Sequence, residues 1–209
     1  TAPKIYGGAF LNGGQVCMAV KRAYVHETIY DEMCAALGKL ADEAIVDDGA
    51  KQGTTQGPSQ NEMQYKKVLN LLESAKEDGT IVAGGTVPDR PGYFLRPTIV
   101  RDVTDGDRIV DEEQFGPILP VIKFSNVDDV VDRVNGSDYG LGGSVWSSDV
   151  DRAIEIANRI ESGTVWVNQH VTIAPNVPMA GYKQSGIGVE QAQEGLDEFT
   201  QMKVVNIAR

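Results

Sequence analysis

Short β-branched runs alternate with amphipathic helical patterns along the whole chain, and this alternation restricts the fold more than any other feature of the sequence. Strands are predicted at residues 23–25, 80–83, 98–100, 119–124, 143–146 and 164–167. Helices are predicted from residue 28, from residue 59, over residues 128–134 and after residue 148. Because parallel strands need long crossovers, this order predicts one α/β domain over residues 1–209, with a largely parallel open sheet covered by helices on both faces.

Particular side chains indicate where the predicted helices begin and end and which of their faces are buried. Thr28 is expected to cap the first helix, and Ser59 with Glu62 has the spacing of a capping box at the start of the second. Gly79 and Gly163 are expected to end the second and fourth helices. The residues expected to be buried are Met63, Val68, Leu71, Leu72 and Ala75 in the second helix, and Val150, Ala153, Ile154, Ala157 and Ile160 in the fourth.

Composition narrows the class of protein. The 209 residues carry a net charge of −11, from 19 basic and 30 acidic side chains, which argues against a nucleic-acid partner. Two cysteines indicate a reducing compartment, and the absence of a signal or transit pattern predicts a cytoplasmic location. No apolar run approaches the roughly 20 residues needed to cross a membrane. Because the chain begins at Thr1 without Met, we expect it to start partway through a longer protein.

Cys17 is the first candidate for chemistry. It follows a Gly-Gly pair that allows a tight turn, and the residues after that pair are predicted to open a helix. The positive end of a helix dipole favours a thiolate, and Lys21 and Arg22 add positive charge nearby. Cysteine is also common as a small buried hydrophobe, so the residues alone leave a structural role for Cys17 open. Cys34, within a predicted helix, is expected to be structural.

A run of three acidic residues at 111–113 is the second candidate. It leads directly into Phe115-Gly116-Pro117, which stiffens the chain just before a predicted strand. Three consecutive acids usually form a solvated face. A carboxylate held on such a turn is nevertheless well suited to accept hydrogen bonds from sugar hydroxyls.

The third candidate is the glycine-dense run over residues 178–190. Glycines at this density indicate a backbone that packs closely against a ligand or another domain. An ordinary surface loop is the alternative.

Other chemistries lack their motifs. His26 and His170 are the only histidines, and no Cys/His spacing for zinc is present, so no metal site is expected. There is no G-x-S-x-G elbow, although this does not exclude a Ser-His-Asp triad. The sequence also lacks a phosphate-binding loop and a G-x-G-x-x-G motif. A nucleotide would therefore have to be held by another mode or another domain.

Taken together, the candidate segments resemble the NAD(P)-dependent aldehyde dehydrogenase superfamily. The family's Glu-x-Phe-Gly-Pro element corresponds to residues 113–117, and residues 135–146, 163–168 and 181–186 also look like family segments in family order. The family's Phe-x-Asn-x-Gly-Gln-x-Cys element is present as Phe10, Asn12, Gly14, Gln15 and Cys17. The resemblance runs through nearly the whole chain and implies the fold of the aldehyde dehydrogenase catalytic domain.

The resemblance also implies a mechanism and site residues. Cys17 would attack an aldehyde to form a thiohemiacetal, hydride would pass to NAD or NADP, and water would hydrolyse the resulting thioester to an acid. Glu113 would bind the nicotinamide ribose and Phe115 would pack beside the nicotinamide. Asn168 matches a site-ordering asparagine, and Glu190 a carboxylate near the water-activating machinery.

The resemblance places the aldehyde tunnel at five positions and leaves the substrate open. The tunnel residues would be Val16, Met18, His170, Ile173 and Met179, which are mostly apolar and favour an aliphatic or aromatic aldehyde. Residues 179–183 read Met-Ala-Gly-Tyr-Lys where the family often has Phe-Gly-Gly-x-Lys. Because methionine in place of an aromatic would change the width of the tunnel, the family's substrates cannot be carried over.

Parts of the family's machinery are not in this sequence. The nucleotide-binding domain, the oxyanion-hole asparagine and the general-base glutamate of the Glu-Leu-Gly-Gly motif all lie upstream of the cysteine segment in the family. We therefore expect residues 1–209 to be a catalytic domain alone, inactive in isolation. Its expected partners are a small aldehyde, the missing nucleotide-binding domain and further copies in a homo-oligomer.

Two other functions are compatible with the same fold. An acyl-phosphate or acyl-CoA reductase would use the same cysteine in the opposite direction, although the segments at 113–117 and 181–186 favour oxidation. A non-catalytic, lens-crystallin-like structural protein is the third possibility. The retained Cys17 argues against it, because a structural protein has no need of a nucleophile.

Overall fold

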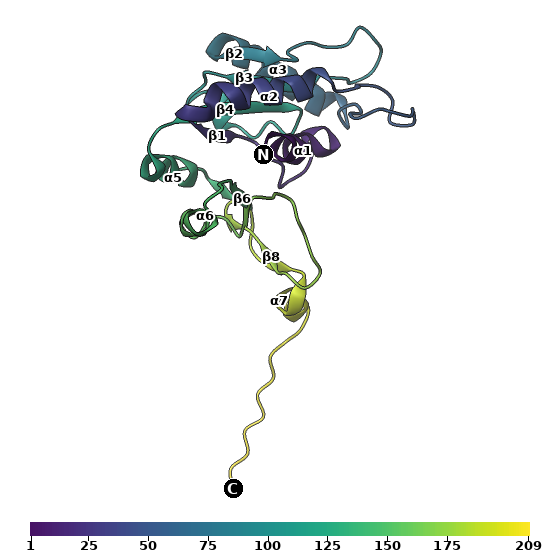
Figure 1. Ribbon diagram of the computed structural model, residues 1–209. Helices are drawn as coiled ribbons and strands as arrows, with labels where there is room; N and C mark the ends of the chain where they lie inside the picture. Colours follow the sequence, from purple (N-terminus) through teal and green to yellow (C-terminus); the bar gives the residue numbers. More distant parts are fainter. The chain divides into compact units, whose positions relative to one another are not determined.

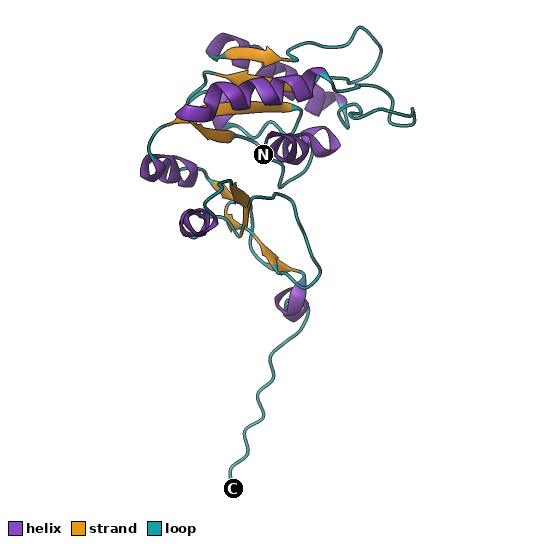
Figure 2. Cartoon of the chain, viewed as in Figure 1, coloured by secondary structure: helices purple, strands orange, loops and turns teal.

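The computed structural model describes all 209 residues, which form two compact units, Thr1–Val134 and Asn135–Arg209. Figure 1 shows the elements of both units in chain order, and Figure 2 separates helices, strands and loops. None of the helices combines the length and the apolar character that a membrane span needs.

The first unit is built on a four-stranded sheet with strand order β1-β4-β3-β2. Its strands are β1 (Ala23–His26), β4 (Ile118–Phe124), β3 (Thr98–Arg101) and β2 (Thr80–Ala83). β1 and β3 both pair with β4 in parallel, whereas β2 pairs with β3 antiparallel. The α/β class and the largely parallel sheet are therefore confirmed. β2 is the exception because no helix lies between it and β3, so the chain simply reverses direction.

Helices cover this sheet on both faces. α2 (Tyr30–Asp42) lies across one face and α3 (Glu62–Asp78) lies behind the sheet on the other (Figure 1). Side chains of α3 pack with alternate residues of the strands, because successive strand side chains point to opposite faces. That cluster includes Val68, Leu71, Leu72, Ala75, Val100, Ile118 and Ile122. The unit also contains α1 (Ala2–Phe10), η1 (Leu11–Gly14), η2 (Glu27–Ile29), α4 (Arg108–Asp111) and α5 (Val127–Asn135).

Two predicted helix starts are wrong. Thr28 does not cap α2, because it lies within the short turn η2 and its amide donates to the ring of His26. The cap of α3 is Asn61, whose Oδ1 accepts the amide of Gln64 at 2.8 Å. Ser59 instead donates its amide to the carbonyl of Tyr93, in the loop between β2 and β3, so the helix begins later. As a result Met63 is 78% exposed rather than buried, while the rest of the predicted stripe and the stop at residue 79 are confirmed.

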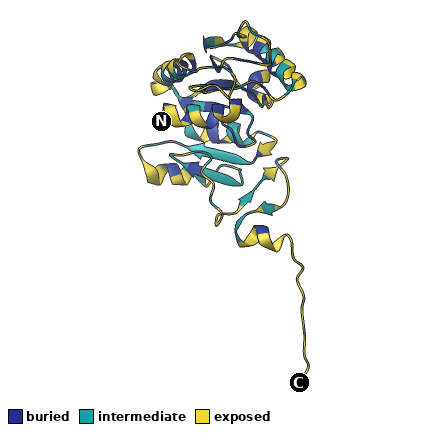
Figure 3. Cartoon of the chain, turned by 90° about the vertical axis from the view of Figure 1, so that its right-hand side faces the viewer, coloured by how far each residue is buried: buried dark blue, intermediate teal, exposed yellow.

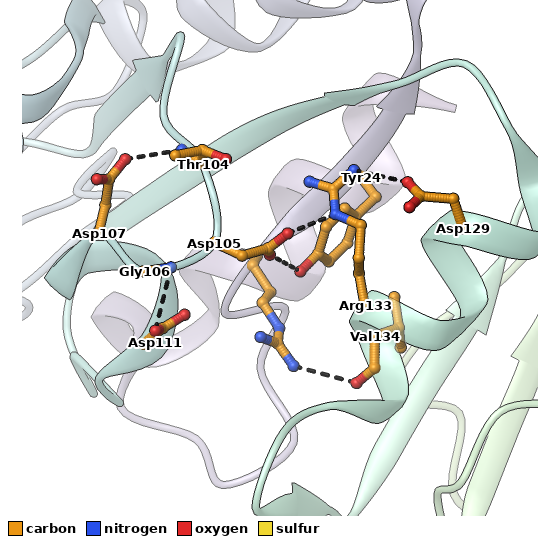
Figure 4. Close-up of polar contacts among 10 residues, drawn as sticks. Tyr24, Thr104, Asp105, Gly106, Asp107, Asp111, Asp129, Arg133 and Val134 are labelled. Carbon is orange, nitrogen blue, oxygen red and sulfur yellow. Dashed lines mark hydrogen bonds and ion pairs between the residues drawn. The ribbon is translucent and has the colours of Figure 1, made fainter.

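A polar cluster joins β1, the loop before α4, and α5 in the first unit (Figure 4). Tyr24 donates its hydroxyl hydrogen to Asp105 at 2.6 Å, and Arg133 forms an ion pair with the same carboxylate. Burial, followed by the hydrogen bond to Asp105, raises the pKa of Tyr24 above its ordinary value. Burial tends to raise the pKa of Asp105 too, but its hydrogen bonds with Tyr24 and Arg133 outweigh burial and hold that pKa below its ordinary value.

The second unit consists of short strands and two helices. Its strands are β5 (Tyr139–Gly140), β6 (Gly142–Val145), β7 (Thr164–Val167), β8 (Met179–Ala180), β9 (Tyr182–Lys183) and β10 (Val189–Glu190). They form three two-stranded pairs: β6 with β7 in parallel, and β5 with β9 and β8 with β10 antiparallel. The helices are α6 (Val150–Ala157) and α7 (Ala192–Asp197), and residues 201–209 form neither helix nor strand.

The predicted buried face of α6 is only partly correct. Ala153 is fully buried, but Val150 and Ile154 are 49% and 46% exposed. Figure 3 shows that the second unit is mostly in the intermediate and exposed colours. The helix ends at Ala157 and not at Gly163. Gly163 has a different role, because a Cβ there would lie 1.7 Å from the carbonyl oxygen of Ala180.

Candidate active site

Cys17 lies in a turn between η1 and β1, with its side chain exposed. The predicted helix after the glycine pair does not form. Asn12 and Gly13 adopt φ values of 52° and 65°, which turn the chain out of a helical path. A turn follows, closed by the amide of Ala19 donating to the carbonyl of Val16 at 3.0 Å. The helix dipole therefore cannot activate Cys17, whereas its exposure fits an accessible nucleophile.

Cys34 contrasts with Cys17. It is buried in α2, and burial raises the pKa of its thiol. A buried, neutral thiol is a poor nucleophile. The prediction that Cys34 is structural agrees with this position.

The three consecutive acids have separate positions. Asp111 accepts the amide of Gly106 at 3.2 Å, and Glu112 accepts a hydrogen bond from Arg108 at 2.6 Å. Glu113 is exposed and has no hydrogen bond or ion pair with the rest of the chain. Of the three carboxylates, only that of Glu113 makes no hydrogen bond or ion pair within the chain.

Phe115 follows in a strained backbone conformation. Its φ is 47°, in the left-handed region that costs a residue with a Cβ about 1–3 kcal/mol. Such strain persists only where surrounding contacts hold it. Here Gln64 on α3 holds the loop, because its Nε2 donates to the carbonyls of Gln114 and Phe115 at 2.7 and 3.0 Å.

The parallel sheet brings the cysteine turn and the Glu113 loop together. Cys17 precedes β1 and residues 113–117 precede β4, and these strands are adjacent and parallel, with Ala23 opposite Val121. The amino ends of both strands therefore lie at the same sheet edge. The two segments touch through their backbones, because a Cβ on Gly14 would lie only 2.4 Å from the carbonyl oxygen of Gly116.

Two further side chains join these segments. Gln114 is 1% exposed, and its Nε2 donates to the carbonyl of Lys21 at 2.9 Å and that of Ile118 at 2.7 Å. The Nζ of Lys21 donates to the carbonyl of Gly14 at 2.7 Å and lies 4.7 Å from the centre of the Phe115 ring. Cys17, Glu113 and Phe115 are thus in one neighbourhood of the first unit.

Gln114 was not predicted from the sequence to be a site residue, and Lys21 was considered only for its charge. Gln114 occupies the variable position of the Glu-x-Phe-Gly-Pro element. The sequence did contain one signal for Gln114: it is an amide between an acidic and an aromatic residue, just before a buried strand. An amide that becomes buried there needs hydrogen-bond partners. One of its two partners, the carbonyl of Lys21, lies 93 residues away in the sequence, so no local pattern predicts that hydrogen bond.

The tunnel residues that flank Cys17 differ in exposure. Met18 is buried, whereas Val16 is only partly covered. Both lie next to the nucleophile candidate along the chain, so they are close to it whatever the surrounding fold.

The other predicted site residues belong to the second unit. Asn168 follows β7 with a φ of 56°, and its side chain accepts the amide of Ser147 at 3.0 Å and donates to the carbonyl of Ser147 at 2.8 Å. His170 lies nearby, with its ring edge-on to Trp166 at 4.9 Å. Asn168 therefore fastens the end of β7 to the segment after β6.

Met179 and Glu190 are cross-strand partners within the second unit. They face each other in the antiparallel pair of β8 and β10. Glu190 is exposed and Met179 half-buried, while Ile173 lies exposed in the loop before β8.

Comparison with known proteins decides the family. The Aldehyde dehydrogenase family matches residues 1–205. The chain belongs to the aldehyde dehydrogenase family. It is 39% identical to aldehyde dehydrogenase 1A1 from Bos taurus and 40% identical to retinaldehyde dehydrogenase 3 from Rattus norvegicus. Both alignments cover 96% of this chain, but only 40% and 39% of those proteins.

Solved structures of aldehyde dehydrogenases have the same fold. The NAD+ complex of an aldehyde dehydrogenase from Bacillus cereus superposes with a TM-score of 0.94 at 38% identity, covering 99% of this chain and 43% of that one. Betaine aldehyde dehydrogenase from Staphylococcus aureus, also with NAD+, gives a TM-score of 0.91 at 35% identity over 95% of this chain and 40% of its own. The chain thus spans about two fifths of the length of the aldehyde dehydrogenases it matches.

Proposed function

We propose that this chain is the catalytic domain of an enzyme that oxidises an aldehyde to a carboxylic acid with NAD or NADP. The observation that carries the proposal is the contact between an exposed cysteine turn and a loop with an uncommitted carboxylate. Cys17 is exposed, Glu113 makes no hydrogen bond or ion pair within the chain, and the backbones of their segments touch at Gly14 and Gly116.

Cys17 is the nucleophile in this proposal. Its sulfur attacks the carbonyl carbon to form a thiohemiacetal, and the backbone amide of Cys17 helps to stabilise the resulting oxyanion. Loss of a hydride from that carbon leaves a thioester on Cys17. Water then hydrolyses the thioester and releases the acid and the free thiol. The side chain that fits this work is the exposed thiol in the turn, because Cys34 is buried.

The residues present fit a nicotinamide cofactor. NAD or NADP, when bound, supplies the hydride acceptor. The unpaired Glu113 carboxylate suits the hydroxyls of a ribose, because a carboxylate that already had partners would lose them on binding. The Lys21 ammonium lies over one face of the Phe115 ring. We propose that this contact helps to hold the ring for packing beside the cofactor.

The second unit contributes ordering residues and a carboxylate. Asn168 holds Ser147 through both atoms of its amide, which supports the role of an ordering asparagine. Glu190 is exposed on β10 and is proposed to lie near the water that hydrolyses the thioester. His170, Ile173 and Met179 are proposed to line the aldehyde tunnel together with Val16 and Met18.

The remaining machinery is proposed to lie outside residues 1–209. A nucleotide-binding domain and a general-base glutamate would complete the site, and the full-length enzyme is proposed to be a cytoplasmic homo-oligomer. The chain by itself should then produce no NADH or NADPH from an aldehyde. Measurable turnover by the purified 209-residue chain would contradict this part of the proposal.

The decisive experiment compares the two cysteines in the full-length protein. Cys17→Ala should abolish aldehyde oxidation, because no other side chain can form the thioester. Cys34→Ala, a matched change at a buried thiol, should retain oxidation at a similar rate. Activity is followed as NADH or NADPH absorbance over a panel of aliphatic and aromatic aldehydes. Equal activity of the two variants would refute the assignment of Cys17.

A further inference from the structure

Lys21 holds a position between the two segments of the proposed site. Its Nζ lies 2.7 Å from the carbonyl oxygen of Gly14, in the segment that leads to Cys17. The same ammonium lies 4.7 Å from the centre of the Phe115 ring, in the segment that carries Glu113. One side chain therefore contacts both segments.

The backbone of Lys21 joins the same two segments. Its carbonyl accepts the Nε2 hydrogen of the buried Gln114 at 2.9 Å. Lys21 thus contributes its side chain and its main chain to separate contacts with residues 114 and 115. A lysine that merely covers apolar surface with its stem would leave its ammonium in water and would not make these contacts.

Burial makes the charged form of Lys21 energetically unfavourable. Burial lowers the pKa of Lys21 to about 8, although the nearby Glu113 carboxylate and Cys17 thiolate act in the opposite direction. A partly buried ammonium is retained where its charge has a use. The two groups whose charges act on Lys21 in this way, Glu113 and Cys17, are those to which the proposed function gives a role.

We propose that Lys21 is a positioning residue of the site, which fixes the cysteine turn against the Phe115 loop and places a positive charge beside Cys17 and Glu113. It acts through these residues and does not itself react with the aldehyde. The inference rests on the proposed function, because the benefit of this arrangement is a more nucleophilic Cys17 aligned with the cofactor loop.

Alkylation of Cys17 tests the charge effect separately from turnover. The rate of iodoacetamide modification at Cys17, located by peptide mass spectrometry, is measured against pH in the full-length protein and in the 209-residue chain. Lys21→Met keeps the length and apolar character of the stem but removes the charge. It should slow modification at neutral pH by about three- to tenfold, because the positive charge beside the attacking sulfur is gone.

Two further variants make the test specific. Lys21→Arg keeps the charge and should restore most of the rate at neutral pH. Lys67→Met removes another positive charge near Lys21, from an exposed position on α3, and should leave the rate within about twofold of wild type. Circular dichroism and urea unfolding confirm that each variant is folded.

Turnover of the full-length protein provides a second readout. Lys21→Met should lower kcat by about tenfold with little change in the aldehyde KM, and Lys21→Arg should recover kcat. A folded Lys21→Met protein with the wild-type alkylation profile would overturn the inference, and so would a loss that Lys21→Arg does not restore. A failure of the proposed function would give a different result. In that case the Cys17→Ala protein would retain aldehyde oxidation, whatever the effect of the Lys21 variants.

Discussion

The backbones of Gly14 and Gly116 lie against each other with no room for a side chain between them. This contact joins the turn that exposes Cys17 to the loop that carries Glu113 and Phe115. The two segments are about a hundred residues apart in the sequence, and the parallel pairing of β1 with β4 brings them to one edge of the sheet. The chemistry proposed for this chain depends on that contact.

Replacement of Gly14 by alanine should destabilise the chain and disturb the site. Its φ of 73° costs a residue with a Cβ about 1–3 kcal/mol, and the added carbon would also overlap the carbonyl of Gly116. Urea unfolding should show this loss, and alkylation of Cys17 should change in rate. Gly7→Ala is the control: it has open space in α1 and should gain about 0.5–1 kcal/mol. Equal stability of the two variants would contradict the close contact.

Replacement of Gln114 by leucine should reduce stability without removing a charge. The carbonyls of Lys21 and Ile118 would each lose a buried donor, and an unsatisfied buried acceptor costs about 1–3 kcal/mol. The urea midpoint of the 209-residue chain measures the effect. Gln52→Leu, at an exposed loop position, should change stability by less than about 0.5 kcal/mol. If the two leucine variants unfold at the same urea concentration, Gln114 does not hold the loop.

Replacement of Glu113 by glutamine should slow hydride transfer in the full-length protein. The lost carboxylate would weaken hydrogen bonds to the cofactor ribose, so we expect about a tenfold fall in single-turnover rate with a smaller effect on aldehyde binding. Stability should stay nearly constant, because Glu113 is exposed and makes no hydrogen bond or ion pair within the chain. Glu112→Gln breaks only the pair with Arg108 and should retain wild-type hydride transfer. An unchanged rate in the Glu113 variant would remove it from the site.

Replacement of Asp105 by asparagine should have a pH-dependent cost. The pKa of Asp105 is held below its ordinary value, so its ionised form stabilises the folded state above the unfolded pKa of about 3.9. That contribution is lost as pH falls through the lower, folded pKa. At pH 7 the variant should lose about 1 kcal/mol, a modest value because the carboxylate is partly exposed.

The gap between this variant and wild type should therefore narrow as the solution becomes more acidic than about pH 4. Urea unfolding at several pH values measures it. Asp132→Asn, on the same helix as Arg133 but exposed, should match wild type throughout. A gap that stays constant down to pH 2 would show that the charge of Asp105 is not the source.

The sequence predicted the regular elements better than their ends. A strand such as β4 begins with five consecutive buried residues, mostly aliphatic, so its pattern is strong and local. The start of α3 was misplaced because two overlapping patterns, Ser59 with Glu62 and Asn61 with Gln64, both suit a cap. The structure uses Asn61, since the amide of Ser59 is bound to a distant loop. Nothing within either four-residue window decides between them.

The sequence suggested the reactive groups of the candidate site, and these stay predictions, but it did not indicate the side chains that hold the site's segments together. Cys17 and the acidic run at 111–113 were candidates from their residue types alone, and the family resemblance then assigned roles to Cys17 and Glu113. The physical reason first given for Cys17, a helix N-terminus, was wrong because positive φ angles at Asn12 and Gly13 turn the chain away. Gln114 contacts the carbonyl of Lys21, 93 residues away, and the ammonium of Lys21 lies beside the Phe115 ring. Both contacts exist only once the sheet has formed.

The hydrogen-bond ladder between β1 and β4 has a consequence for how the site can vary. Both Cys17 and Glu113 lie in segments that lead into these strands, so their separation is set where Ala23 pairs with Val121. A shift of one residue in this pairing would slide the thiol past the carboxylate by about 3.3 Å, roughly the length of a hydrogen bond. It would also turn every side chain of one strand to the other face of the sheet. The alignment of nucleophile and carboxylate is thus protected by the same apolar packing that keeps the protein folded.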